Sequence, residues 1–369
     1  MLALAACLGV LWPVVGPAAA EHLIAVVATK GSPHQPFGTE VVEGTKAAVA
    51  RLNATGGVLG DTARVVAWSE DCSRERAIAI AEEIARLRPQ VVVGHLCAGA
   101  AMAAAPVYAQ AGILLIAPGV RLPALTASAH SGLVLRLAGR DDRFASDTVG
   151  FIARRYPGLS VALVADRTRQ ARGLAAGIGA ELRRQQVALS HDERIESGEK
   201  SYDAVAASIL SSGAGVVVMP AQPIELGVLV ASLRRAGVEA PLVGSEILAV
   251  PSLITTAEQE AGRLVLMLPW TGLESAGEER TGRVAAGVGE QDHRLQRAAR
   301  RRAEAAVEVW AQAAVRAKSA EPAAVASAAR EAAAATVSGS IRFDAAGDAV
   351  IASYVPHVWR DGDWRPLEP

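Results

Sequence analysis

The chain is poor in aromatic residues, and its charge is almost balanced. Phe, Trp and Tyr make up 4% of its 369 residues although 51% are hydrophobic, so Ala, Val and Leu supply most of the apolar surface. The formal net charge of −1 argues against a nucleic-acid-binding protein, because such a protein needs a basic face to neutralise phosphates. The apolar fraction excludes a disordered chain, and the length predicts two domains.

The sequence also lacks the motifs of the common enzyme classes. It contains no Gly-Lys-Ser or Gly-Lys-Thr of a P-loop, no GxSxG, no HExxH and no set of kinase motifs. The glycines of residues 173–179 lie within a helical pattern and suit helix packing better than a phosphate cradle. Neighbouring carboxylates such as Glu70 and Asp71 are typical of a solvated surface, and the seven His are scattered. We therefore expect no enzyme, no metal and no cofactor.

The first twenty residues carry no charged side chain and end in three alanines, which favours a signal peptide and export to the periplasm. A positively charged N-region is missing. Leu4-Ala5-Ala6-Cys7 resembles a lipoprotein box, so anchoring through a lipid on Cys7 is the alternative. A membrane anchor is less favoured, because Pro13 and Pro17 interrupt the stretch.

Two cysteines, Cys72 and Cys97, remain after residue 20. In an oxidising compartment such a pair favours a disulfide, which would stabilise the fold by about 3.5 kcal/mol on the chain-entropy model. Two buried free thiols are the alternative.

From residue 21 onward, short β-branched runs alternate with longer helical patterns. The alternation predicts βαβ units, and hence parallel sheets that are doubly wound with helices on both faces. A first series ends near residue 120 and a second starts near residue 160, so we expect two α/β lobes. The predicted strands are 22–28, 64–68, 90–94, 113–116, 161–164, 215–219 and 242–243, and the predicted helices are 41–53, 73–87, 98–109, 171–185 and 223–236.

The last third of the chain departs from this alternation. A long helix is predicted at 294–318, and Pro322 opens a second helix that continues through the Ala-rich residues 323–336. Residues 338–340 are predicted to form a turn. Strands are expected at 341–343, at 351–358 and around Trp364.

Five arginines cluster in the long helix, at positions 294, 297, 300, 301 and 302. Arg300 and Arg301 stand four and three residues before Glu304, spacings that favour a solvated, ion-paired helix face. The alternative is a docking face for an acidic patch on a partner protein.

Residues 94–123 are the most informative stretch. A strand ends at Gly94, the turn Leu96-Cys97 follows, and a helix starts with small residues at Ala98 and Gly99. The next strand ends in a loop that contains Gly119 and Arg121. Ligands of open α/β sheets lie at the carboxyl ends of strands, where helix N-termini offer free N–H groups. Tight packing of a small-residue helix is the alternative interpretation.

This stretch, together with others, resembles the periplasmic leucine/isoleucine/valine-binding proteins of branched-chain amino acid ABC transporters. The matching segments are GGVLGDTARVVAWSEDC at 56–72, GHLC at 94–97, ILLIAP at 113–118, LVGSE at 242–246 and FDAAGD at 343–348. The resemblance implies a type I periplasmic binding protein fold, with two doubly wound parallel-sheet lobes joined by three hinge crossings. It implies that Cys72 pairs with Cys97. It divides the chain into residues 21–139 plus about 269–345 in lobe 1, and 140–268 plus about 346–369 in lobe 2.

The resemblance also implies a ligand site in the cleft between the lobes. The expected site residues are Phe37, Leu96, Cys97, Ala98, Gly99, Gly119, Arg121, Gln170 and Glu246. Ala98 and Arg121 stand where the family has hydroxyl side chains that hold the ligand carboxylate. Gln170 and Ala221 replace aromatic residues of the second lobe, whereas Glu246 keeps the acidic residue that accepts the ligand ammonium.

A buried carboxylate that loses two hydroxyl donors is left short of hydrogen bonds, and an arginine can replace them with two parallel bonds. We therefore hypothesise a small organic ligand, a carboxylate or a modified amino acid, held by Arg121 and Glu246. The alternative has Arg121 in solvent and an ordinary amino acid held by the N–H groups of residues 98–100.

The resemblance implies a monomeric, non-enzymatic carrier without a cofactor. Its partners would be a small-molecule ligand and the inner-membrane ABC permease with its ATPase subunits. A sensory or scaffold protein that has lost transport is the alternative, and a hydrolase on this fold ranks third.

Overall fold

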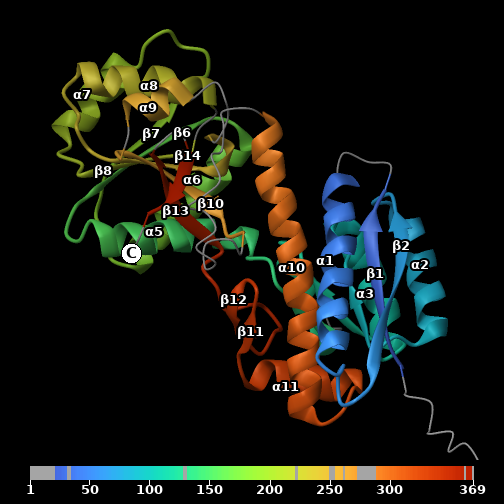
Figure 1. Cartoon of the computed structure of the whole chain (residues 1–369). Coiled ribbons are helices and arrows are strands. Elements are labelled where there is room, and N and C mark those ends of the chain that lie inside the picture. The colour runs from blue at the N-terminus through green and yellow to red at the C-terminus, as the bar shows by residue number, and fades with distance from the viewer. Residues whose placement is uncertain are drawn as a thin grey trace, which may run out of the picture.

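The computed structural model describes residues 21–30, 35–127, 131–220, 223–248, 254–260, 262–271, 288–360 and 363–367. The expected signal peptide, Cys7 and Ala221 lie outside these residues. Two α/β bodies, each built around its own sheet, meet at a junction near the middle of the molecule (Figure 1). We call the body around the five-stranded sheet lobe 1, and the body around the seven-stranded sheet lobe 2.

Lobe 1 has a fully parallel sheet in the order β2-β1-β3-β4-β5. The strands are β1 (Glu21–Thr29), β2 (Thr62–Glu70), β3 (Val91–Val93), β4 (Leu114–Ala117) and β5 (Val134–Arg136). The covering helices are α1 (Gln35–Ala54), α2 (Arg74–Leu87), α3 (Ala98–Gln110), α4 (Ala124–Ala127), α10 (Val288–Ala317) and α11 (Pro322–Glu331). Helices from both ends of the chain therefore build one lobe.

The lobe 1 sheet is covered on both faces, which is why its inner strands β1, β3 and β4 are continuous apolar runs. On one face Ile24 and Val26 of β1 pack with Val41 of α1 and Trp310 of α10. On the other face neighbouring residues of the same strands pack against α2 and α3.

Lobe 2 has a mixed sheet in the order β14-β13-β10-β9-β8-β6-β7. Its parallel strands are β6 (Val161–Asp166), β7 (Leu189–Ile195), β8 (Val216–Met219), β9 (Leu242–Ser245) and β10 (Leu264–Pro269). The antiparallel edge is formed by β13 (Tyr354–Arg360) and β14 (Asp363–Pro366). The helices of this lobe are α5 (Phe144–Arg155), α6 (Arg169–Arg184), α7 (Asp203–Ser211), α8 (Pro223–Arg235) and α9 (Ile254–Gln259).

The expected helix through residue 336 is wrong, because α11 ends at Glu331. Ala334–Thr336 form β11, which pairs antiparallel with β12 (Gly339–Ile341). The backbone of Ala335 is held by the Gln312 side chain of α10, at 2.7 Å and 3.1 Å. Tertiary contacts therefore override the helix propensity of alanine. The expected turn at 338–340 is also partly wrong, since β12 begins at Gly339, and the strand predicted to start at 351 begins at Tyr354.

Three crossings join the lobes, and they pack against one another at Ser353. The Ser353 carbonyl accepts a hydrogen bond of 3.0 Å from Trp270 N in the second crossing. Its hydroxyl accepts one of 2.8 Å from Arg140 N in the first crossing. A Cβ on Gly139 would lie 2.5 Å from Ser353 Cα, so only glycine allows this approach. Nearby, Asp348 of the third crossing pairs with Arg136, the last residue of β5, and with Arg140 of the first crossing.

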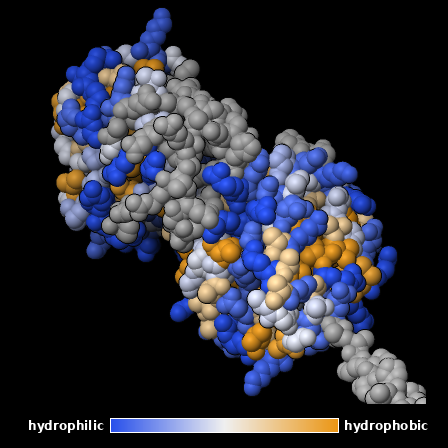
Figure 2. Space-filling model, viewed as in Figure 1, coloured by the Kyte–Doolittle hydropathy of each residue, from blue (hydrophilic) through white to orange (hydrophobic). Residues whose placement is uncertain are grey.

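The surface of the molecule is mostly hydrophilic in the view of Figure 2, with apolar residues gathered on parts of lobe 1. Among the described residues, no helix is both long enough and apolar enough to cross a membrane.

Candidate functional site

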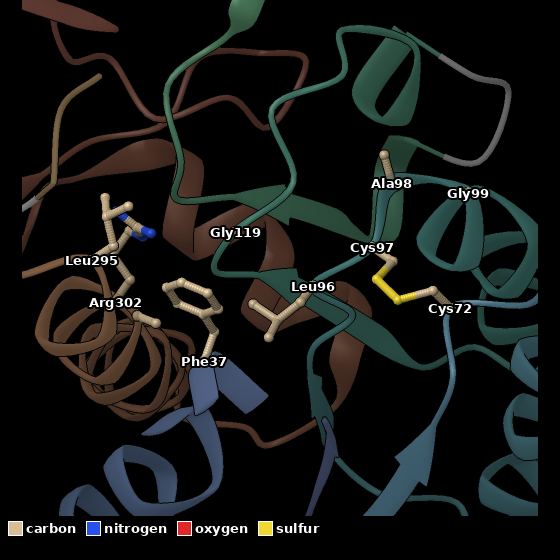
Figure 3. A pocket seen from close by; sticks show the side chains of 10 residues that line it. Phe37, Cys72, Leu96, Cys97, Ala98, Gly99, Gly119, Leu295 and Arg302 are labelled. Carbon is tan, nitrogen blue, oxygen red and sulfur yellow. A yellow bond between two sulfur atoms is a disulfide. The ribbon is translucent and has the colours of Figure 1, made fainter. Parts of the chain in front are cut away.

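A cavity of about 740 Å³ opens on lobe 1 beside the carboxyl ends of its strands (Figure 3). Its walls come from the first turn of α1, the end of β2, the start of α3, the loop after β4 and the first half of α10. The lining residues are Phe37, Cys72, Leu96, Cys97, Ala98, Gly99, Gly119, Leu295, Ala299 and Arg302. Six of the nine expected ligand residues thus lie around one cavity, and all of its described lining residues belong to lobe 1.

Backbone geometry places the start of α3 at this cavity. Gly94 has φ +149°, and a Cβ there would lie 2.7 Å from the Val27 carbonyl oxygen, so only glycine can end β3 in this way. The chain then turns through Leu96 to Cys97, the N-cap of α3, whose side chain makes no capping hydrogen bond. The first residues of α3 therefore line the cavity, and their N–H groups have no side-chain cap, which suits an anion.

The predicted disulfide is confirmed. Cys72 and Cys97 are bonded, with 5.5 Å between their Cα atoms, and the bond joins the end of β2 to the start of α3. The alternative of two free thiols is wrong.

Three buried polar side chains, Glu70, His95 and Tyr108, form a hydrogen-bonded triad near the disulfide. His95 Nδ1 is 2.6 Å from Glu70 Oε2, and His95 Nε2 is 3.0 Å from the Tyr108 hydroxyl. Burial, followed by the negative charge of Glu70, raises the pKa of the Tyr108 phenol. Glu70 is only 2% exposed, so its assignment to a solvated surface is wrong. Glu70 and His95 each lie two residues before a disulfide cysteine. The hydrogen bond between them therefore holds together the two segments that carry the disulfide.

Arg302 belongs to the cavity, although the sequence placed it in a basic helix face. Its Nε donates to the Pro118 carbonyl at 2.7 Å, and Nη1 donates to the Thr271 carbonyl at 3.2 Å. Figure 3 shows Phe37 between Arg302 and Leu96. The ion pair predicted four residues apart is confirmed for Arg300 and Glu304 at 3.3 Å. In the sequence, only the position of Arg302 in the arginine cluster at 294–302 singled it out, and nothing indicated a place at the cavity.

Arg121 and Glu246 do not line the cavity but lie together at the junction of the lobes. Arg121 Nε donates to the Gly139 carbonyl at 3.3 Å, and its Cζ lies 4.6 Å from the centroid of the Tyr354 ring. Arg121 is partly buried and packs against Tyr354, and whether it or the N–H groups of residues 98–100 hold a ligand stays a prediction. Gln170 is exposed in the first turn of α6, which Thr168 caps.

Burial raises the pKa of the Glu246 carboxyl. A hydrogen bond from its own backbone N–H, the charge of Arg121 and a hydrogen bond from Tyr354 act in the opposite direction. Burial is the largest of these effects, so the pKa of the carboxyl stays above its ordinary value. Within the described part of the chain, no group of His, Cys, Asp and Glu side chains could hold a metal ion.

Two α/β lobes, three packed crossings and a cavity at the carboxyl ends of strands define the type I periplasmic binding protein fold. A family model described as "Periplasmic binding protein" matches residues 23–363. The chain belongs to this family, and the resemblance to the branched-chain amino acid binding proteins is confirmed.

Three known proteins illustrate the similarity. The Leu/Ile/Val-binding protein of Escherichia coli (strain K12) is 28% identical over 246 residues, which are 67% of this chain and 67% of that protein. A substrate-binding protein of Desulfitobacterium hafniense in complex with Leu has 21% identity and a TM-score of 0.64, over 94% of this chain and 100% of that one. A solute-binding protein of Rhodopseudomonas palustris HaA2 in complex with p-hydroxybenzoic acid has 15% identity and a TM-score of 0.59, over 95% and 96% of the two chains. The two structures show the shared fold.

Proposed function

We propose that this protein is the extracytoplasmic solute-binding component of an ABC importer. It binds a small amino acid or a related organic acid between its lobes and delivers the ligand to an inner-membrane permease with its ATPase subunits. The observation that carries the proposal is the cavity, which joins an uncapped helix start to apolar walls. The relatives support it, since the E. coli protein is named for Leu, Ile and Val and the R. palustris protein holds p-hydroxybenzoic acid.

The lining suggests how such a ligand is held. The N–H groups at the start of α3 receive the carboxylate, while Phe37 and Leu96 contact the apolar part. Arg121 lies outside this lining, at the junction of the lobes, and its guanidinium approaches the carboxylate on closure. Closure about the hinge brings Gln170 and Glu246 of lobe 2 onto the ligand and excludes water. Family membership indicates an extracytoplasmic location. We propose that residues 1–20 are the export signal and that the mature chain acts as a monomer.

The first experiment identifies the ligand. The protein is purified without residues 1–20, and small molecules released on denaturation are identified by mass spectrometry. Calorimetric titration with Leu, Ile, Val and simple organic acids follows. We expect one ligand per chain with a dissociation constant of about 1 μM or lower. Absence of binding to every amino acid and organic acid tested contradicts the proposal.

A point substitution tests the start of α3. Ala98→Asp places a carboxylate at the first helical N–H groups, where it competes with the ligand. The helix itself tolerates an acidic residue in this turn. We expect binding to weaken at least about tenfold, which corresponds to roughly 1.4 kcal/mol.

Ala323→Asp is the matched control, because Ala323 is exposed in the first turn of α11 in the same lobe. It should bind the ligand as the unmodified protein does. Equal affinities of the two variants would show that the start of α3 does not hold the ligand.

A further inference from the structure

Three exposed leucines lie at the end of lobe 2 that is opposite the cleft. Leu159 precedes β6, Leu189 is the first residue of β7, and Leu210 lies near the end of α7, shortly before β8. Their exposed fractions are 43%, 38% and 51%. Strands β8, β6 and β7 are neighbours in the sheet, so the leucines lie together at the amino ends of the strands. Ligands of such sheets lie at the carboxyl ends.

Close contacts join the loops that carry these leucines. Gly215 N donates to the Ser160 carbonyl at 2.9 Å, and Val161 N donates to the Ala188 carbonyl at 2.8 Å. A Cβ on Gly215 would lie 2.7 Å from Leu159 Cβ, so the loops before β6 and β8 pack closely. The leucines are thus held as one surface. We call it the lobe 2 tip and define it by residues 154–160, 183–190 and 210–215.

Arginines border the leucines of the lobe 2 tip. Helices α5 and α6 pack on the same face of the sheet, and each ends in two arginines before a strand begins at the tip. The four exposed arginines are Arg154, Arg155, Arg183 and Arg184. Arg184 pairs with Glu181, whereas the other three form no ion pair among the described residues. The residues that define the tip include no Asp or Glu.

The lobe 2 tip therefore combines positive charge with apolar side chains, although the whole chain has a net charge of −1. This combination suits an anionic membrane, because guanidinium groups pair with lipid phosphates and apolar side chains enter the boundary between headgroups and acyl chains. A second copy of the chain fits less well, since two tips would bring like charges together. A binding hot spot for another protein also fits less well, since leucine is under-represented in such hot spots.

We propose that the lobe 2 tip binds reversibly to the surface of a membrane that contains anionic phospholipids. The arginines supply the electrostatic attraction, and Leu159, Leu189 and Leu210 supply the apolar contact. The inference goes beyond the proposed function, because the described lining of the ligand cavity belongs to lobe 1 and includes no residue of the tip. Since the tip is opposite the cleft, a membrane-bound carrier keeps its cleft open to ligand.

Sedimentation with lipid vesicles tests the inference. The protein lacks residues 1–20, so that this apolar segment cannot itself insert. Vesicles contain phosphatidylglycerol and phosphatidylcholine, or phosphatidylcholine alone. We expect binding to the anionic vesicles to be at least about tenfold tighter than to the neutral ones, and to weaken when salt rises from about 0.1 M to about 0.5 M.

Two results of this experiment would overturn the inference and leave the proposed function intact. The first is equal binding to the two kinds of vesicle, because the arginines would then have no part in it. The second is absence of binding to the anionic vesicles. If the protein in that case sediments as a dimer, a second copy covers the tip instead of a membrane.

A variant without three of the charges tests the arginines. Arg154→Gln/Arg155→Gln/Arg183→Gln should weaken binding to the anionic vesicles at least about tenfold, because each arginine near an anionic surface adds to the attraction. All three side chains are exposed, so we expect the variant to unfold at the temperature of the unmodified protein. Its affinity for the transported ligand should not change.

The matched control removes three exposed arginines from α2 of lobe 1. It is Arg74→Gln/Arg76→Gln/Arg86→Gln, which changes the net charge by the same amount. It should bind the anionic vesicles as the unmodified protein does. Equal weakening in the two variants would show that net charge and not the tip governs binding, and the inference would be wrong.

A leucine substitution tests the apolar contact. Leu210→Gln should weaken binding to the anionic vesicles at least about threefold, because it removes an apolar side chain from the lipid boundary. Leu87→Gln is its control, since Leu87 is a leucine of α2 in lobe 1 with a similar exposed fraction of 53%. If both variants bind the vesicles alike, the leucines of the tip do not contact the membrane and the inference fails.

Discussion

At the scale of single residues, the site depends on polar side chains that are buried rather than solvated. Glu70, His95 and Tyr108 are each at most 2% exposed and are joined by hydrogen bonds of 2.6 Å and 3.0 Å. Buried polar groups must be hydrogen-bonded, and an unpaired one costs about 1–3 kcal/mol. This hydrogen-bonded triad therefore fixes the turn at Leu96, and with it one wall of the cavity.

Replacing the central histidine should destabilise the protein strongly. His95→Leu leaves the Glu70 carboxyl without its partner, although Glu70 Oε1 already has none among the described residues. We expect a loss of about 3 kcal/mol in the free energy of unfolding by urea. Tyr108→Phe is the control, because it removes one hydrogen bond and should lose about 1 kcal/mol. Equal stability of His95→Leu and the unmodified protein would show that the hydrogen bonds of Glu70, His95 and Tyr108 do not stabilise the fold.

The sequence could not reveal these residues, for a physical reason. Glu70 and Arg302 are buried by segments far away in the chain, and local charge patterns carry no information about such neighbours. Arg302, for example, donates to the carbonyls of Pro118 and Thr271. Phe37, Leu96 and Gly119 were predictable because the resemblance assigns them positions, and they lie around the cavity. Their role in binding stays a prediction.

At the scale of elements, the hinge depends on the close approach of two crossings. Gly139 faces Ser353 so tightly that a Cβ would lie 2.5 Å from Ser353 Cα. The Ser353 Cα is a backbone atom, so no side-chain rotation can relieve the contact. The carbonyl of Gly139 also accepts the hydrogen bond from Arg121 Nε. The hinge and the loop that carries Arg121 therefore share one contact.

A single methyl group should disturb this element. Gly139→Ala should lower the free energy of unfolding by about 1–3 kcal/mol, because the added Cβ forces the crossings apart. The readout is thermal and urea unfolding. Gly173→Ala is the matched control, at an exposed position of helix α6 where a Cβ meets nothing within 4 Å. It should be neutral or stabilising. If the free energy of unfolding falls equally in the two variants, the close packing of the crossings does not contribute to stability.

The elements that the sequence predicted correctly are those with a clear apolar pattern. Strand β1 follows from its continuous apolar run, and helices α1 and α10 follow from their helical patterns. Strand β11 was missed because alanine favours helix, whereas its pairing depends on Gln312 and on β12. The antiparallel direction of β13 was not predictable either, because direction depends on the path of the third crossing.

At the scale of the whole molecule, the two lobes are interleaved along the chain. The alternation of strands and helices predicted two α/β lobes, but only the resemblance predicted three crossings between them. Helix α10 shows why this matters, since it follows the lobe 2 strand β10 in sequence yet packs on lobe 1 against α1 (Figure 1). A chain that crosses three times resists separation of the lobes and still permits rotation about the crossings.

The cavity predicts a change of overall shape on ligand binding. Its described lining residues all come from lobe 1, so the ligand is buried only when lobe 2 closes over it. A ligand that contacts both lobes shifts the population toward the closed form, by as much free energy as it gains from closure.

Small-angle X-ray scattering measures this change directly. We expect the radius of gyration to fall when saturating ligand is added to the unmodified protein, and to stay constant for Ala98→Asp at the same ligand concentration. Ala323→Asp should close like the unmodified protein. If the ligand binds by calorimetry but the scattering curve does not change, then binding needs lobe 1 alone. Glu246, on lobe 2, would in that case have no part in holding the ligand.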